Sequence, residues 1–476
     1  MEKLLYMQLV DQISQQIRDG MFKVGERLPS VRKLSQREQV SIATVNTAYA
    51  NLEQRGWIEA RPKSGYFVRR SSLDTVDLPS KSKITGRPKP VNINELAMEV
   101  QRGSSIKTGS SFCAAVPDIN FPISKIIQRT FVSQARMGKT FGEGYDTPEG
   151  NAELRHQVAK RALEAGIKLK SDDLITTAGA QNALALALRA MTVPGDIVAV
   201  ESPCYFGLLQ MIESFGLKAV EVPADPKEGI SIDALKLALQ QWPIKAVVSI
   251  PAFSNPLGCS ISDEHKKALI GLLQQYDIAM IEDDIYGELN FEGRRPKAVK
   301  AFDDDGRVLW CSSVSKTMEP QLRVGWIAPG RYYDKILHQK YVNSISNPSL
   351  AQSVVAQVME QGQYERHLRQ AREAYRQRSQ HLLDLAMIHF PSEMRASSPK
   401  GGLVTWFEMP KSIDATQLYH YCREQGVRIA PGELFSISGL YQHCFRMSHA
   451  KPWTTQSEQA VGLIGQQLKK MLLQSN

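Results

Sequence analysis

Apolar residues near the start of the chain recur at the spacing of one helical face. They stand at Leu5, Leu9, Ile13 and Ile17. Because a helix brings positions about four apart onto one side, this pattern predicts an amphipathic helix over residues 4–19. Gly20 and Gly25 then break the pattern.

Two further helices are predicted before residue 56. Ser30 and Ser41 are placed to cap them, since a serine side chain accepts a hydrogen bond from a free backbone N–H at a helix start. The inward face of the third helix is formed by Val45, Ala48 and Leu52. Its opposite face carries the small polar residues Thr44, Thr47 and Asn51.

Residues 57–68 are predicted to form a short hairpin with a basic tip. Two apolar strands flank a turn that contains Arg61, Pro62, Lys63, Ser64 and Gly65. Three helices followed by such a hairpin are the layout of a winged helix-turn-helix (α+β). In that layout the third helix enters the DNA major groove and the wing contacts phosphate or the minor groove.

The rest of the chain has a different pattern. From about residue 110, short β-branched runs alternate with longer helical stretches. This alternation predicts an α/β fold with a largely parallel sheet flanked by helices. From about residue 400 the pattern indicates a smaller α+β subdomain.

These patterns predict three parts. Residues 1–70 form the winged helix-turn-helix domain, and 71–95, rich in Ser, Pro, Lys and Thr, form a linker. Residues 96–476 form the second domain, with its small subdomain at about 385–476.

Charge separates the parts as well. Residues 1–70 hold 12 Lys and Arg against 7 Asp and Glu, and the first 90 residues carry +7 of the chain's net charge of +9. A basic head on a nearly neutral body points to a polyanionic partner for the head alone.

Other features narrow the class of protein. The six cysteines are widely spaced, with no C-x-x-C pair, so we expect neither a metal site nor a disulfide framework. No apolar run reaches the roughly 18 residues that span a bilayer, and the N-terminus does not resemble a signal peptide. We therefore expect a cytoplasmic protein without a membrane segment.

The body's most informative stretch is residues 312–326. Lys316 lies in a Ser-rich turn after an apolar run, and Arg323 follows seven residues later. A lysine in this position could attack an aldehyde as a Schiff-base nucleophile, with Ser313 and Arg323 binding a nearby phosphate.

A second group of residues suits a pyridine ring. Asp283 ends a predicted strand, and a carboxylate there would keep a ring nitrogen protonated. Tyr286, three residues on, and Asn255 in a turn could hydrogen-bond a ring oxygen. The neighbouring Asp284 is the alternative carboxylate, and the spacing to Tyr286 favours Asp283.

A third group could complete the site. Ala180 and Gln181 begin a predicted helix, whose free N–H groups and dipole favour phosphate. Tyr205 could stack on the ring, and Arg446 could clamp a substrate carboxylate.

The first seventy residues resemble the DNA-binding domain of the GntR family. The resemblance rests on the patterns LPS-x-R-x-L and VS-x-x-TV and on the glycine-framed wing. It implies DNA contacts from Arg32, Thr44, Lys63, Ser64 and Gly65, and Ser41 and Thr47 are added to this group. Ile42 stands where family members often carry Arg, and this departure affects one base or phosphate contact.

Residues 110–470 resemble the fold-type I pyridoxal-phosphate aminotransferases. The matching motifs are Y-x-x-P-x-G from Tyr145, N-P-x-G at 255–258, D-x-x-Y at 283–286 and S-x-S-K ending at Lys316. The resemblance implies that Lys316 holds pyridoxal 5'-phosphate as an imine. It also implies that Tyr145 reaches the phosphate of a partner subunit in a homodimer. Leu257 and Ala180 depart from the threonine and hydroxyl residues common there.

The two resemblances together are the architecture of the MocR subfamily of regulators. They imply a transcription regulator that binds a double-stranded DNA operator and senses a small amino compound or the cofactor itself. The alternative from another class is a catalytically active aminotransferase that carries a DNA-binding domain. A third possibility is a regulator that responds to the level of the cofactor alone.

Overall fold

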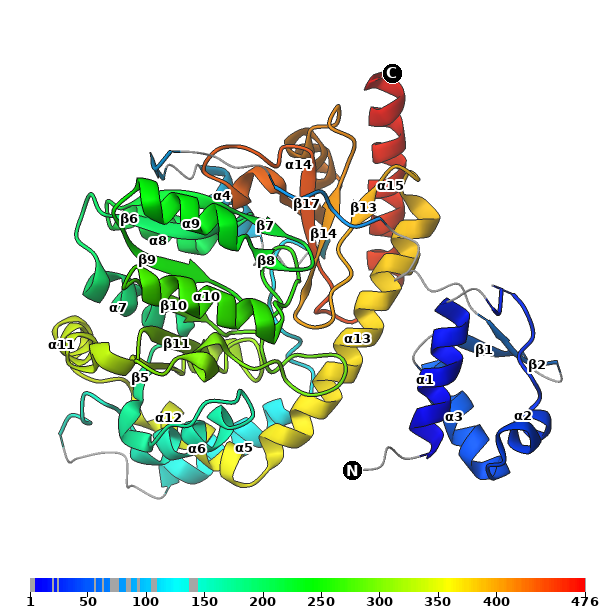
Figure 1. Cartoon of the computed structure of the whole chain (residues 1–476), viewed down its shortest axis with the longest axis horizontal. Helices are drawn as coiled ribbons and strands as arrows, with labels where there is room; N and C mark the ends of the chain where they lie inside the picture. The colour runs from blue at the N-terminus through cyan, green and yellow to red at the C-terminus, as the bar shows by residue number, and fades with distance from the viewer. Residues whose placement is uncertain are drawn as a thin grey trace. The chain divides into compact units, whose positions relative to one another are not determined.

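The structure is a computed structural model that describes residues 5–18, 21–23, 25–54, 57–61, 64–68, 77–82, 87–91, 95–103, 109–136 and 144–475. The chain divides into two compact units at residues 76 and 77 (Figure 1). We call them the N-terminal and C-terminal units and describe each by itself. Lys63 lies outside the described residues.

The N-terminal unit is a winged helix-turn-helix, as predicted. Its elements are α1 (Leu5–Arg18), α2 (Val31–Glu38), α3 (Ile42–Gln54), β1 (Ile58–Arg61) and β2 (Gly65–Val68). Ser30 and Ser41 accept the backbone N–H groups of Lys33 and Thr44, which starts α2 and α3 where the sequence indicates. β1 and β2 pair antiparallel as the wing.

A small apolar core holds this unit together. Leu9 and Ile13 of α1, Leu34 of α2, and Val45 and Leu52 of α3 are all buried in it. Burying each such side chain stabilises the fold by about 1.5–3 kcal/mol. The core therefore fixes α3 with its polar face outward.

The C-terminal unit is built on a large mixed sheet. The strands of this sheet are β3 (Lys89–Pro90), β5 (Ile175–Thr177), β6 (Ile197–Ser202), β7 (Lys218–Asp225), β8 (Gly229–Ile230), β9 (Ile244–Ser249), β10 (Ala279–Asp283), β11 (Val308–Ser313) and β12 (Gly325–Ala328). The order is β3-β7-β6-β9-β10-β11-β12-β5, and β8 pairs with β7. The central strands β7, β6, β9, β10 and β11 are parallel. β3, β12 and β5 run antiparallel to their neighbours.

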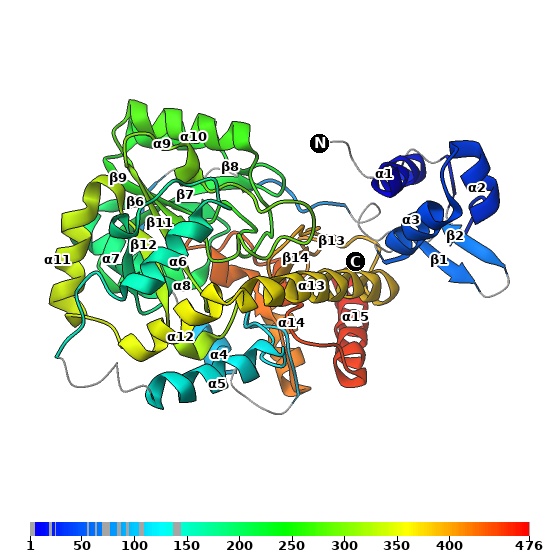
Figure 2. The same ribbon diagram turned by 90° about the horizontal axis from the view of Figure 1, so that it is seen from below.

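Helices cover both faces of this sheet, as Figure 2 shows. They are α5 (Ile123–Arg136), α6 (Ala152–Ala162), α7 (Ala180–Met191), α8 (Phe206–Ser214), α9 (Ile232–Gln241), α10 (Asp263–Gln275), α11 (Tyr333–Ser344) and α12 (Ser349–Glu360). Adjacent strand residues face opposite layers: Val247 packs with the core of α9 and α10, and Val248 with that of α7 and α8. This explains why the strands are continuous apolar runs.

A smaller sheet forms a second lobe. The elements of this small lobe are β13 (Arg395–Ala396), β14 (Val404–Glu408), α14 (Ala415–Glu424), β15 (Val427–Arg428), β16 (Ala430–Pro431), β17 (Cys444–Ser448) and α15 (Thr455–Ser475). The long helix α13 (Gln363–His389) leads to it, and α4 (Glu95–Gly103) and β4 (Ser110–Ser111) come earlier in the chain. β4 pairs with β15, so an early segment completes the late lobe. The predicted fold class is confirmed.

The described parts of the predicted linker pack on the C-terminal unit. Ser80 donates a hydrogen bond to Glu408 at 2.7 Å, and Ser82 donates to the backbone oxygen of Ser202 at 3.0 Å. Lys89 lies in β3, at the edge of the large sheet. The described residues 77–82 and 87–91 are therefore fastened to both lobes. The domain boundaries at 70 and 95 stay predictions.

Two further observations concern the class of protein. Among the described residues, no helix combines the length and the apolar character needed to cross a membrane. All six cysteines are buried free thiols.

Candidate functional site

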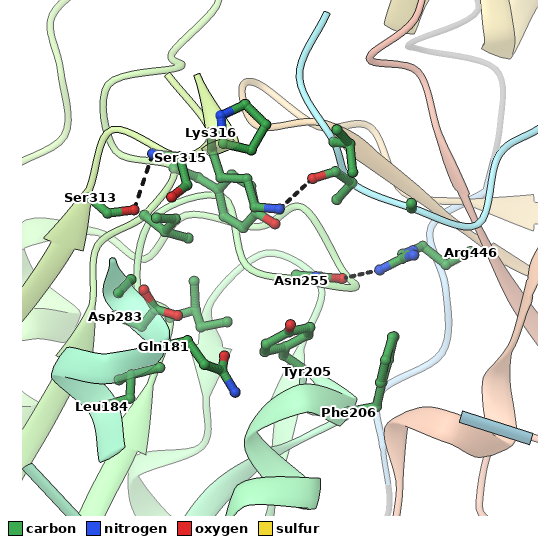
Figure 3. A pocket seen from close by; sticks show the side chains of 18 of the residues that line it. Gln181, Leu184, Tyr205, Phe206, Asn255, Asp283, Ser313, Ser315, Lys316 and Arg446 are labelled. Carbon is green, nitrogen blue, oxygen red and sulfur yellow. Dashed lines mark hydrogen bonds between the residues drawn. The ribbon is translucent and has the colours of Figure 1, made fainter. Parts of the chain in front are cut away.

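A pocket opens where the parallel strands of the large sheet end. Asp283 closes β10 and Ser313 closes β11, and Ile250 directly follows β9. The cavity has a volume of about 260 Å³ and is completed by Arg446 from β17 of the small lobe. The carboxyl edge of an α/β sheet is the usual place for a ligand. Figure 3 shows side chains from both lobes around this space.

Lys316 is one of the residues that line this pocket. Its side chain is half-buried, and Nζ donates a hydrogen bond of 2.6 Å to the backbone oxygen of Ala115. Burial, helped by the positive charges of Arg446 and Arg323 and opposed by Asp283, lowers the pKa of Lys316 to about 8. A substantial fraction of the amine is therefore neutral and nucleophilic near pH 7.5.

The two adjacent carboxylates have different surroundings. Asp284 is held by the indole N–H of Trp310 at 2.6 Å and by the guanidinium of Arg295. Asp283 lines the pocket, and its buried Oδ1 has no hydrogen-bond partner among the described residues. Burial and the neighbouring Asp284 raise the pKa of Asp283 to about 7. Asp283 is thus the one that offers a free acceptor.

One end of the pocket is suited to an anion. Arg323 donates to Ser315 Oγ at 3.2 Å and to the backbone oxygen of Ala178 at 2.9 Å, just before the start of α7. Gly179 there has a φ of +89°, and a Cβ on it would meet the Arg323 guanidinium at 2.6 Å. Glycine therefore lets a cation approach the N-terminus of a helix whose free N–H groups already favour negative charge.

Arg446, which also lines this pocket, is a buried cation. Arg446 donates to Asn255 Oδ1 at 2.9 Å and to the backbone oxygen of Cys113. Its Nε is buried and has no hydrogen-bond partner within the described part of the chain. Burial lowers the pKa of this guanidinium. A ligand carboxylate could pair with it.

The structure brings most of the predicted cofactor residues together. The pocket is lined by Ala180, Gln181, Tyr205, Asn255, Asp283, Tyr286, Ser313, Lys316, Arg323 and Arg446. Tyr145 is the exception, because it is 82% exposed and does not line this pocket.

The predicted DNA-contacting residues lie in the N-terminal unit. Arg32, Ser41, Thr47 and Ser64 are exposed, and Thr44 and Gly65 are half-buried. Thr44 and Ser41 share a hydrogen bond of 2.8 Å between their hydroxyls. The start of α3 therefore presents small polar groups, and nothing in the structure describes Lys63.

Some pocket residues were missed by sequence reasoning. Ser315 was part of the S-x-S-K motif, but only the structure shows that its hydroxyl meets Arg323. Ala115 and Phe206 also line the cavity and carry no sequence signal of their own. Arg295, the partner of Asp284, could be recognised only once the fold brought the two together.

Comparison with known proteins agrees with this architecture. Residues 5–68 match the family described as bacterial regulatory proteins, gntR family, and residues 124–464 match aminotransferase class I and II. The uncharacterized HTH-type transcriptional regulator YjiR of Escherichia coli (strain K12) is 39% identical, over 97% of this chain and 98% of its own length. A second such regulator from the same strain, YdcR, is 36% identical, over 98% of this chain and 99% of its own.

A solved structure supports the fold of the body. The α-aminoadipate aminotransferase LysN from Thermus thermophilus, complexed with N-(5'-phosphopyridoxyl)-L-leucine, has a TM-score of 0.72 and 27% identity. The match covers 81% of this chain and 97% of that one.

The chain belongs to the HTH-type transcriptional regulators that join a gntR-family DNA-binding domain to an aminotransferase class I and II domain, the architecture of the MocR subfamily. It is thus a transcription regulator by family, with an aminotransferase fold as its body.

The charges around Lys316 predict an unusual titration. Reductive methylation of Lys316, followed by mass spectrometry from pH 6 to 11, should show half-maximal reactivity near pH 8. Asp283→Asn should lower the Lys316 midpoint further, because it removes the negative charge that favours the ammonium. A midpoint for Lys316 near the free-lysine value of roughly 10.4 would contradict this account of the pocket.

Proposed function

We propose that this regulator holds pyridoxal 5'-phosphate in the pocket around Lys316 and senses an amino compound, or the cofactor itself, through it. The observation that carries the proposal is the buried Oδ1 of Asp283, which lacks a partner among the described residues and shares a cavity with Lys316. A pyridinium N–H is the kind of donor that such a carboxylate needs. The site thus fits the group that its fold family uses.

Each part of the cofactor has a matching residue in the pocket. Lys316 supplies the amine for covalent attachment, and Asp283 holds the proton of the ring nitrogen. Asn255 and Tyr286 serve the ring oxygen, and Tyr205 the ring face. The phosphate is assigned to Ala180, Gln181, Ser313 and Arg323. When bound, pyridoxal phosphate supplies an aldehyde carbon that condenses with amines and a ring that withdraws electrons.

Arg446 is assigned to the carboxylate of an amino compound. Its unpartnered Nε supports this role, since a buried guanidinium donor is stabilised by an anionic acceptor. Asn255 holds the guanidinium in place from the other side. An effector with both an amine and a carboxylate would thus be bound at two points.

We further propose that the chain acts as a cytoplasmic homodimer on a double-stranded DNA operator. Arg32, Ser41, Thr44, Thr47, Lys63, Ser64 and Gly65 are assigned to the DNA. Tyr145 is assigned to the phosphate in the partner's pocket, and its 82% exposure supports a role outside its own subunit. The DNA that a gntR-family domain would bind lies in the bacterial cytoplasm, which supports the cytoplasmic location.

Residues 77–82 offer a route between the pocket and the DNA-binding unit. Ser82 holds the end of β6, three residues before Tyr205, and Ser80 holds Glu408 on β14. β14 pairs with β17, which carries Arg446. An occupant that changes the spacing of Tyr205 and Arg446 therefore acts on both anchors of the segment that follows the wing. Such an occupant must prefer one arrangement to shift the population.

The alternative is a working aminotransferase, because the pocket holds every group that transamination needs. Visible absorbance distinguishes the two when amino acids are added to the loaded protein, with and without a 2-oxoacid. If the protein is a regulator, its visible absorbance band should shift when the amino acid is added and should not return when the 2-oxoacid follows. Repeated cycles, restored by the oxoacid, would establish the aminotransferase. Lys316→Ala should remove the original band, and an unchanged spectrum in that variant would overturn the cofactor assignment.

DNA binding gives an independent prediction. Arg32→Ala should weaken binding about tenfold at every salt concentration, measured by anisotropy on a duplex that the protein itself selects from random sequences. Arg37→Ala is the matched control on α2, because the Arg37 side chain is paired with Glu38 at 2.8 Å. Equal affinities for the Arg32 variant and the unaltered protein would contradict the docking of α2 and α3 proposed here.

A further inference from the structure

Helix α13 touches the residue that follows Lys316. The Tyr364 hydroxyl donates to Thr317 Oγ1 at 2.7 Å, and His367 Nε2 lies 2.8 Å from the backbone oxygen of Thr317. The N–H of Thr317 in turn points to Val314 O at 3.3 Å. The backbone next to Lys316 is thus held through its side chain, its carbonyl and its amide.

The protonation state of His367 suits a side chain that always donates a hydrogen bond to the backbone oxygen of Thr317. A carbonyl oxygen can only accept, so Nε2 must carry the hydrogen. Burial lowers the pKa of His367 to about 4, and its Nδ1 has no partner among the described residues. His367 is therefore neutral at physiological pH, with one tautomer set by Thr317.

The same helix also holds the acceptor of the lysine amine. Lys316 Nζ donates to Ala115 O, three residues before Asp118. The backbone N–H of Asp118 donates to the Tyr375 hydroxyl at 3.1 Å, and its carboxylate accepts from Arg378 at 2.9 Å. Both ends of the lysine therefore depend on side chains of α13, spaced about three turns apart.

The helix itself is firmly placed at the end near Thr317. The guanidinium of Arg161 lies 4.5 Å from the centre of the Tyr364 ring and bonds Glu365 at 2.8 Å. Arg161 also pairs with Glu288 at 3.0 Å. Tyr364 is thus fixed on its ring face as well as at its hydroxyl.

We propose that α13 is the positioning element of Lys316: Tyr364 and His367 fix its backbone through Thr317, and Tyr375 and Arg378 fix the acceptor of its amine through Asp118. None of these four side chains lines the pocket, so each acts through another residue. Holding a nucleophile at both ends reduces the freedom it must lose on reaction. The inference rests on the proposed cofactor site, but its first test needs no cofactor.

The test compares three single hydroxyl deletions. Tyr364→Phe and Tyr375→Phe each remove one bond of the proposed support. Tyr419→Phe is the matched control, because this buried tyrosine of α14 donates to Glu99 at 3.1 Å and does not touch this support. Tyr364 and Tyr375 each lose a bond to a neutral group, and Tyr419 loses one to a carboxylate, so the control should lose at least as much stability as the support variants.

The readout is the pH midpoint of Lys316 methylation in the protein without cofactor. The charged groups that face the amine are Asp283, Arg323 and Arg446. A lysine freed from its place relaxes towards water, so both support variants should raise the midpoint from near 8 towards the ordinary value. They should also slow the uptake of added pyridoxal phosphate about fivefold. The control should change neither quantity.

A pair of variants at position 367 separates positioning from folding. His367→Gln keeps a side-chain N–H for Thr317 and should stay near the unaltered protein, whereas His367→Leu should behave as Tyr364→Phe does. Support variants that lose stability but keep the Lys316 midpoint and the uptake rate would overturn the proposal. If the unaltered protein takes up no pyridoxal phosphate while the midpoints still move, the proposed function fails and the positioning role stands.

Discussion

Burial of the Lys316 ammonium is the constraint on which the rest of the site depends. A charged amine out of water is costly, so the pocket must either pair it or let it become neutral. The structure combines both solutions. The hydrogen bond to Ala115 and the nearby carboxylate of Asp283 favour the charged amine, whereas the guanidinium groups of Arg446 and Arg323 favour the neutral amine. The balance leaves an amine whose pKa is about 8, which suits a nucleophile near neutral pH.

The fold supplies this balance by bringing distant segments to one sheet edge. Asp283 ends β10 and Lys316 lies just beyond β11, so their proximity follows from the parallel pairing of these two strands. Arg446 comes from the other lobe, and Arg295 neutralises Asp284 behind Asp283. The charges that act on Lys316 are therefore set by tertiary structure.

Much of this could be predicted from local patterns. Some features depend only on residues that are close together in the sequence, within one or two helical turns or a single strand. They are the cap at Ser41, the apolar stripe of α3 and the alternation of strands and helices in the C-terminal unit. Lys316, Asp283 and Arg323 stood in motifs whose chemistry is local. Residues 71–95 were expected to be a linker because they are rich in Ser, Pro, Lys and Thr, but within this range Ser80 bonds Glu408, 328 positions away. Tyr364 and His367 were missed for the same reason, since they reach Thr317 across 47 and 50 positions.

The central claim is that the occupied pocket changes how the protein binds DNA. The most direct measurement is the affinity for one self-selected duplex, with pyridoxal phosphate fixed to Lys316 by borohydride and without it, alongside Lys316→Ala given the same treatment. Coupling free energies between sites are typically 1–3 kcal/mol, so the loaded and free protein should differ by roughly 5–150-fold. The Lys316→Ala protein should show one affinity throughout. Identical affinities for the loaded and free unaltered protein would contradict the claim that this pocket regulates DNA binding.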